Sequence, residues 1–489
     1  MALYNLRAES LAKAGRGREA AEDYLKAASL TGSDNASELR RAAAEQLIRS
    51  GYLEEGIELF TNLLRSNSVR IPSSRLETLL RMLVIRLFIR LRGLKWRECP
   101  EAEVPGDTLL RLDLLWSGAM TLVTVDTIAG SYLQALHMLT ALRTGEPSRL
   151  ASTFAFGAVY ESMGGTHEYE HGRKLIQMAH RLTKQVNDPF KWAVSYACWA
   201  GLDLLAGHVS DGLAHARTAV AGMQEANRHS RAWELGTANM LVIWFLGWGG
   251  QIRELSQALP VLVEEGRSRS DVYTEAYLRC CGVSHLVELA ADRPEDARSE
   301  MRSSIKLWRK SSYDLPHFYT TLAGVECLLY EGHTREAREL LLSDWKAIKK
   351  SLFTRKSQIH RTILFYLRGR TSLAEWLRNA GNDTLRLDVE KFAGRLRRVD
   401  SPWSIAYSML LHAGVAAGLE RPADALDLLS QAEDILREQD LRLFAAAVSR
   451  RRGQLEGDKG LRRIEDAESF MAAENIKRPD RMAFMLLPY

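Results

Sequence analysis

A six-residue turn recurs along the chain, and it restricts the possible folds more than any other feature of the sequence. Each copy opens with glycine or an acidic residue and carries an acidic residue at its fifth position. Segments with helical periodicity flank the copies, which begin at Gly15, Gly51, Gly207, Gly250, Asp292, Gly332 and Glu420. Glycine ends a helix in the left-handed conformation at little cost, and the dipole of the next helix favours an acid in its first turn. The pattern therefore predicts helix–turn–helix hairpins.

The order of small and bulky residues around the first turn indicates the kind of hairpin. Ala8 and Leu11 precede the turn, and Ala20, Tyr24 and Ala27 follow it. The small residues let two helices approach closely, while the bulky residue fills the groove between hairpins. This order resembles the tetratricopeptide repeat, whose period is about 34 residues. Because strand signals are nearly absent, the sequence predicts an all-α fold, a right-handed α-solenoid of tetratricopeptide-like helical hairpins.

The spacing of the turns divides the chain into four predicted parts. Residues 1–70 should form tetratricopeptide-like repeats, and residues 71–200 divergent helical repeats that include a basic helix. Residues 201–460 should form repeats with a period of 40–44 residues, followed by a C-terminal tail at 461–489. The interval between Gly51 and Gly207 has room for about three or four hairpins. Because residue 4 already occupies a repeat position, we expect another segment or a docked partner to precede it.

Charge and cysteine content argue against several functional classes. Basic residues outnumber acidic ones by only 66 to 61, so no general attraction to nucleic acid or membranes follows. The five cysteines have no C-x-x-C spacing, which indicates free thiols in a reducing compartment. The first residues lack a signal-peptide pattern, and the longest apolar run, Met240–Gly250, is too short to span a membrane. The sequence therefore predicts a cytoplasmic protein.

One segment has the spacing of a zinc site. The run His167-Glu-Tyr-Glu-His171 satisfies H-E-x-x-H, in which two imidazoles share one helical face. Gly164 and Gly165 come just before it, so the segment starts a helix rather than lying inside one, and no third ligand is identifiable. We expect an exposed first turn of a helix. A zinc hydrolase is an alternative that would require metal in the purified protein.

No other catalytic motif is recognisable in the sequence. Gly15–Ala20 mimics the G-x-G-x-x-G dinucleotide loop, but a helical pattern precedes it where that loop needs a strand. P-loop, nucleophile-elbow and kinase catalytic motifs are missing. Adjacent Cys280 and Cys281 lie in an apolar segment and are expected to be buried thiols. We predict no enzymatic activity and no catalytic, cofactor-binding or metal-binding residues in this chain.

Three stretches resemble the C-terminal region of large bacterial serine/threonine protein kinases that also carry an AAA-type ATPase module. They are residues 60–98, residues 109–151 and the terminal run FMAAENIKRPDRMAFMLLPY at 470–489. In that family helical repeats follow a kinase and a P-loop ATPase. The resemblance implies a regulatory or sensory scaffold that binds protein or ligand and passes occupancy to a catalytic module, upstream or docked in trans. The alternative is a stand-alone adaptor or transcription-associated solenoid that binds an acidic partner or nucleic acid.

The basic stretch RMLVIRLFIRLRGLKWRE at 81–98 is the candidate contact region. Placed on one helix, its cations form two clusters on opposite sides: Arg86, Arg90 and Arg97 against Arg81, Arg92 and Lys95. Two apolar arcs lie between them, one of Leu83, Leu87, Leu91 and Leu94, the other of Ile85, Ile89 and Trp96. Two arcs predict a helix packed between neighbouring hairpins, whereas a membrane-surface helix needs one wide apolar face. We therefore expect no membrane contact. Nucleic-acid binding is disfavoured because only half of the cations share one side, and Arg86, Arg90 and Arg97 are the candidate partner-binding residues.

Overall fold

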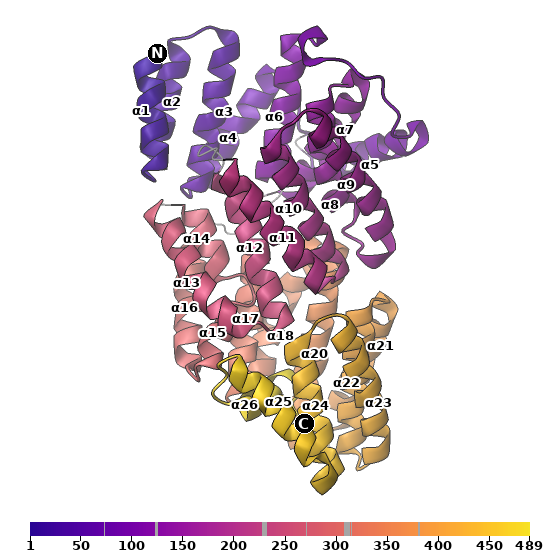
Figure 1. The fold of residues 1–489 in the computed structure, drawn as a ribbon. Coiled ribbons are helices and arrows are strands. Elements are labelled where there is room, and N and C mark those ends of the chain that lie inside the picture. The colour runs from indigo at the N-terminus through magenta and orange to yellow at the C-terminus, as the bar shows by residue number, and fades with distance from the viewer. Residues whose placement is uncertain are drawn as a thin grey trace.

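The computed structural model describes residues 1–72, 74–122, 126–226, 232–269, 271–307, 313, 315–379 and 382–489. Within these ranges every regular element is a helix, which confirms the predicted all-α solenoid (Figure 1). The first elements are α1 (Ala2–Lys13), α2 (Gly17–Ser29), α3 (Ser33–Arg49), α4 (Leu53–Ser66), α5 (Arg75–Arg92), η1 (Glu101–Glu103), α6 (Gly106–Leu122), α7 (Thr127–Thr144), α8 (Pro147–Glu161), η2 (Thr166–Glu168) and α9 (Tyr169–Gln185).

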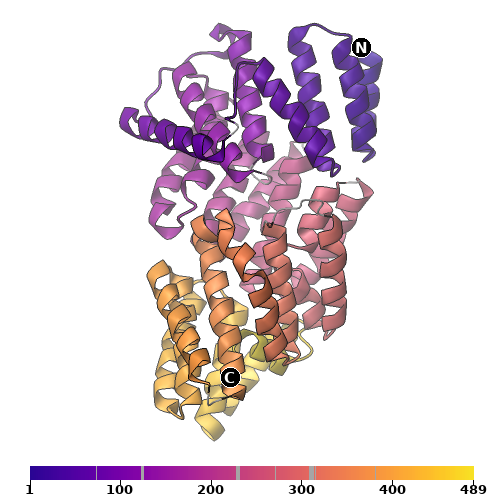
Figure 2. The ribbon, with the colours of Figure 1, turned by 180° about the vertical axis from the view of Figure 1, so that it is seen from behind.

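The remaining helices continue the array toward the C-terminus, which lies at the opposite end of the molecule from the N-terminus (Figure 2). They are α10 (Pro189–Ala206), α11 (Val209–Glu225), α12 (Ala232–Gly249), α13 (Ile252–Ser268), α14 (Val272–Arg279), α15 (His285–Ala290), α16 (Pro294–Leu307), α17 (Leu315–Tyr330), α18 (Thr334–Lys350), α19 (Leu352–Lys356), α20 (Gln358–Arg378), α21 (Asp383–Val399), α22 (Pro402–Gly418), α23 (Pro422–Glu438), α24 (Arg442–Glu456), η3 (Gly457–Gly460), α25 (Leu461–Ala473) and α26 (Pro479–Leu486). No described helix combines the length and the apolar character needed to cross a membrane.

The predicted turns adopt the predicted backbone conformation. A positive φ occurs at the first residue of all of them, namely Gly15, Gly51, Gly207, Gly250, Asp292, Gly332 and Glu420. Asp292 and Glu420 adopt this conformation although they carry a Cβ, with φ of 56° and 57°. Each turn joins two antiparallel helices, such as α10 and α11 around Gly207. The hairpin prediction is therefore confirmed.

The interval between Gly51 and Gly207 departs from the regular array. It holds two hairpins, α6–α7 and α8–α9, where the sequence suggested room for about three or four. The remaining length is taken up by α5, which has no hairpin partner, and by a non-helical stretch after it. In Figure 2, α5 runs across the neighbouring helices instead of alongside them. The division into 1–70, 71–200, 201–460 and 461–489 stays a prediction.

The solenoid is wound tightly enough for distant repeats to touch. Helix α3 contacts α14, α10 contacts α20, and α12 contacts α24. The indole of Trp403 donates a 2.9 Å hydrogen bond to the carbonyl of Gly207, and the Thr166 amide donates one of 2.9 Å to the side chain of Gln358. Most repeat arrays are held together by neighbouring repeats alone. Here, side chains also join successive turns of the superhelix.

The C-terminal tail packs inside this array. Met482, Met485 and Leu487 are buried, and α26 lies against α17 and α24. The Lys477 amide donates a 2.9 Å hydrogen bond to the carbonyl of Ala290 in α15. Within the predicted tail, α25 pairs with α24 as a further hairpin, whereas α26 packs against α17 and α24 and has no hairpin partner among the described helices.

Candidate partner-binding surface on α5

Helix α5 covers residues 75–92, so it is as long as the predicted basic helix over 81–98 but begins and ends six residues earlier. The Ser74 side chain accepts a hydrogen bond from the Glu77 amide and begins the helix, and Gly93, with a φ of 75°, ends it. Residues beyond Gly93 leave the helix, so Arg97 does not continue the row of Arg86 and Arg90. The prediction of one helix over 81–98 is wrong in this respect. The signal for the correct end was Gly93 itself, which favours a helix terminus.

One apolar arc of α5 is buried, as predicted. Met82 and Ile89 belong to the hydrophobic core, and Thr78 is buried beside them. Ile85 packs against two core clusters, and α7 supplies most of the contacts. Beyond the helix, Trp96 lies with its ring centroid 5.5 Å from that of Phe154 in α8. This inner side fixes α5 to the body of the protein.

The other apolar arc faces solvent. We define the α5 stripe as the exposed residues Leu76, Leu80, Leu83, Val84, Leu87 and Leu91. Leu83 is 50% exposed, Leu87 56% and Leu91 78%. The prediction that α5 is sandwiched between hairpins is therefore wrong, because no described helix covers this side. Large contiguous apolar surfaces of this kind mark sites of interaction.

The three candidate arginines have different environments. Arg90 is exposed at the border of the α5 stripe, whereas Arg86 is half-buried and its Nε is buried without a hydrogen-bond acceptor among the described residues. Arg97 is exposed in the extended segment, where its carbonyl packs against Gly145 at the end of α7. The structure therefore brings Arg86 and Arg90 together and sets Arg97 apart. Whether they bind a partner stays a prediction.

Further cations lie on the other border of the α5 stripe. Exposed Arg81 forms a 2.8 Å ion pair with Glu77. Arg143 of α7 lies over the ring of Phe88, with its guanidinium carbon 5.7 Å from the ring centroid. Arg92 instead donates hydrogen bonds to backbone carbonyls, including that of Leu142 at 3.1 Å. Neither was a sequence-based candidate, because Arg81 lies on the opposite side of the helix from Arg90 and Arg143 lies outside the basic stretch, in α7.

The histidine pair is not arranged as a metal site. His167 lies in η2 and His171 in α9, so the two side chains do not share one helical face. The Nε2 of His171 lies 2.8 Å from a carboxylate oxygen of Glu161, and this hydrogen bond raises the pKa of His171. Both histidines are exposed, as expected for a first turn. Across the described residues, no group of three or more potential ligands could hold a metal ion.

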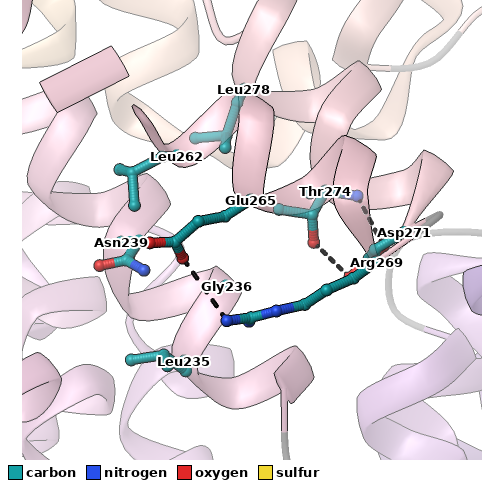
Figure 3. A pocket seen from close by; sticks show the side chains of 10 residues that line it. Leu235, Gly236, Asn239, Leu262, Glu265, Arg269, Asp271, Thr274 and Leu278 are labelled. Carbon is teal, nitrogen blue, oxygen red and sulfur yellow. Dashed lines mark hydrogen bonds and ion pairs between the residues drawn. The ribbon is translucent and has the colours of Figure 1, made fainter. Parts of the chain in front are cut away.

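A small cleft between α12, α13 and α14 is too small for a ligand (Figure 3). Its volume is about 20 Å³, enough for one water molecule, whereas pockets for small molecules span roughly 300–1,000 Å³. Its polar side chains pair with one another: Arg269 with Glu265 at 3.7 Å, and Thr274 with Asp271 at 2.8 Å. The cleft is therefore a small gap in the packing of these helices and not a binding site for a small molecule.

A largely buried network of charges joins three repeats. Glu326 in α17 accepts a 2.6 Å hydrogen bond from Arg370 in α20, and its other oxygen lies 2.7 Å from the Nε2 of His285 in α15. Burial alone would raise the pKa of Glu326, but the Arg370 charge and the His285 hydrogen bond outweigh it and lower the pKa to about 2. The Arg370 guanidinium also lies 5.3 Å from the Tyr366 ring. The side chains of Arg370 and Glu326 are only 2% and 12% exposed, so the network holds repeats together and offers little surface to a ligand.

Comparisons with known proteins assign no family. No protein-family model matches the sequence, and no curated protein matches it. Among solved structures, one match is the crystal structure of Rap protein complexed with competence and sporulation factor. The sequences are 12% identical, the TM-score is 0.42, and the match covers 90% of this chain and 99% of that chain. A likeness this distant carries no functional argument.

Proposed function

We propose that this chain is a non-catalytic, cytoplasmic helical-repeat scaffold that binds a protein partner through the α5 stripe. The observation that carries the proposal is the exposure of six large apolar side chains in one continuous row. Covering such a row would remove apolar surface from water, at about 25 cal/mol per Å². Neither the polar network around Glu326 nor the water-sized cleft beside α13 has room for a small ligand.

The resemblance to the kinase–ATPase family suggests what the scaffold serves. We propose that a partner bound at α5 regulates a kinase or ATPase module, which is either upstream in the same polypeptide or docked in trans. The contacts between distant repeats support this. Because they join non-adjacent hairpins, a structural change at α5 would reach more of the protein than the neighbouring hairpins alone. A stand-alone adaptor for an acidic partner is the second candidate, and the arginines beside the α5 stripe favour it.

Affinity capture with matched variants tests the proposal. The bait is the full chain, compared with a Leu83→Gln/Leu87→Gln variant of the α5 stripe. The control variant is Leu387→Gln/Leu461→Gln, whose leucines are equally exposed, at 56% and 57%, on α21 and α25. We expect a protein that the wild type and the control retain and the stripe variant loses. Identical capture by all three baits contradicts the proposal, and a kinase or ATPase among the stripe-dependent proteins supports its regulatory part.

A further inference from the structure

The α5 stripe has the spacing of a helix-packing seam. Leu76, Leu80, Leu83 and Leu87 follow one another at intervals of four, three and four residues, which is the a/d spacing of a coiled coil. Val84 and Leu91 widen the seam on one side. Side chains at this spacing form the holes into which the knobs of a second helix fit. An α-helix is therefore the shape of partner that this surface suits.

Both borders of the seam carry positive charge. Arg90 lies seven residues after Leu83 and so continues the same row, with Arg86 beside it. On the opposite border lie Arg81 and Arg143, both exposed. The whole of α5 contains five arginines and a single acid, Glu77, which is already paired with Arg81. A partner that fills the seam must place its own flanking residues next to these cations.

Building on the proposed function, we infer that the α5 stripe binds an amphipathic helix of a protein partner, with an apolar seam and acidic residues on both flanks. A second copy of this chain fits poorly. Pairing two α5 helices in either direction sets arginines against arginines, because both borders are basic, and like charges at an interface are unfavourable. Acidic flanks instead give charge-assisted hydrogen bonds to the guanidinium groups.

A lipid surface also fits less well than a helix. Large exposed apolar side chains near α5 are confined to α5 itself, because α6, α7, α8 and α9 present none among their described residues. A bilayer would contact these neighbouring helices as well, whereas one partner helix needs only a seam one helix wide. The inner side of α5 is held by the protein core, so the helix is not free to sink into an interface.

Two designed peptides test the inference. Each is 18 residues long, the length of α5, and has leucine at its a and d positions. One carries glutamate at the flanking positions and the other lysine. Fluorescence anisotropy with the full chain should show the glutamate peptide binding roughly tenfold tighter or more, with an affinity that falls as salt rises. Equal binding of both peptides, or binding of neither, overturns the inference.

Charge reversal provides the matched control. An Arg81→Glu/Arg90→Glu variant should lose the preference for the glutamate peptide and gain affinity for the lysine peptide. An Arg40→Glu/Arg398→Glu variant, which changes two exposed arginines on α3 and α21, should keep the wild-type preference. If both variants behave alike, the preference comes from net charge and not from α5, and the inference fails.

Two further measurements test whether a lipid surface or a second copy of this chain occupies the α5 stripe instead. Sedimentation of anionic phosphatidylserine vesicles with the wild type, lost in the Leu83→Gln/Leu87→Gln variant, would overturn the inference in favour of a lipid surface. A dimer lost in the same variant would overturn it in favour of a second copy. If neither peptide binds but affinity capture still finds a protein that depends on the α5 stripe, the inference of an acidic partner helix is wrong and the proposed function stands. If capture is unaffected by the stripe variant, the proposed function itself fails.

Discussion

The hydroxyl of Tyr366 in α20 donates a 2.7 Å hydrogen bond to the carbonyl oxygen of Leu486 in α26. Both groups are buried, and the Tyr366 ring stacks on Tyr407 with centroids 4.2 Å apart. Further along, the Tyr489 hydroxyl donates a 3.1 Å hydrogen bond to the carbonyl of Leu410. The C-terminal tail is thus held by specific polar contacts as well as by apolar packing.

Removing the Tyr366 hydroxyl should weaken this attachment. Tyr366→Phe leaves the Leu486 carbonyl buried without its donor, which costs about 1–3 kcal/mol of unfolding free energy. Urea denaturation followed by circular dichroism measures the loss. The control is Tyr196→Phe, because the hydroxyl of Tyr196 makes no hydrogen bond to the described residues. Equal stability of both variants would show that the contact contributes nothing.

Substitutions on the buried side of α5 should lower stability much more than substitutions on its exposed side. Ile89→Ala removes a buried side chain from the core and should lower the free energy of unfolding by about 2–4 kcal/mol. Leu87→Ala, at an exposed position two residues away, should change it by less than about 0.5 kcal/mol. Urea titrations of both variants measure the difference. A large loss for Leu87→Ala would mean that the α5 stripe is covered in the isolated protein.

The buried network predicts a dependence of stability on pH. The pKa of Glu326 is lowered from 4.5 to about 2 in the folded protein. Its contribution is therefore complete above pH 4.5 and is lost as the pH falls toward 2. Glu326→Gln leaves Arg370 buried without its counter-charge, which should cost about 3–5 kcal/mol at neutral pH.

The difference between wild type and Glu326→Gln should shrink as the pH falls from 4.5 toward 2, and urea titrations at several pH values measure it. Glu465→Gln, at an exposed carboxylate, should change stability by less than about 0.5 kcal/mol throughout. A gap between wild type and Glu326→Gln that stays constant with pH would contradict the assignment of a charged Glu326.

The cysteines should differ sharply in reactivity. Burial raises the pKa of Cys280 to about 12 and that of Cys281 to about 11, while Cys99 is half-exposed. Because the thiolate is the reactive form, a thiol reagent should label Cys99 rapidly and the buried thiols after unfolding. Cys99→Ser should abolish the rapid phase. A rapid phase that persists in this variant would show that another thiol is accessible in the folded protein.

The sequence predicted local structure better than it predicted which surfaces are covered. The left-handed turns followed from glycine and from the repeated pattern, which identified Asp292 and Glu420 as turn residues without glycine. The two apolar arcs were predicted correctly only within α5, because Leu94 and Trp96 lie beyond its end. Which arc is buried depends on α7 and on how α5 crosses the array, and neither is encoded in the periodicity of residues 81–98.

The candidate arginines also show that their surroundings were harder to predict than their local structure. Of the three candidates, Arg90 lies exposed at the border of the α5 stripe, Arg86 is half-buried, and Arg97 lies beyond the end of the helix at Gly93. Arg143 could not be found from the basic stretch, because it reaches the α5 stripe from α7. Contacts between successive turns of the superhelix, such as that of Trp403 with Gly207, depend on rotations accumulated over many hairpins, and no local pattern reports them.

The hydrogen bond from Trp403 to Gly207 also limits how this array can change length during evolution. Open repeat arrays gain or lose single hairpins easily, because each unit contacts only its neighbours. Here the loss of one hairpin between α11 and α22 would rotate everything that follows and move the indole away from its carbonyl. Duplication of a unit would do the same. The number of hairpins between the two residues is therefore fixed by the geometry of the superhelix, and tolerated insertions should be confined to its loops.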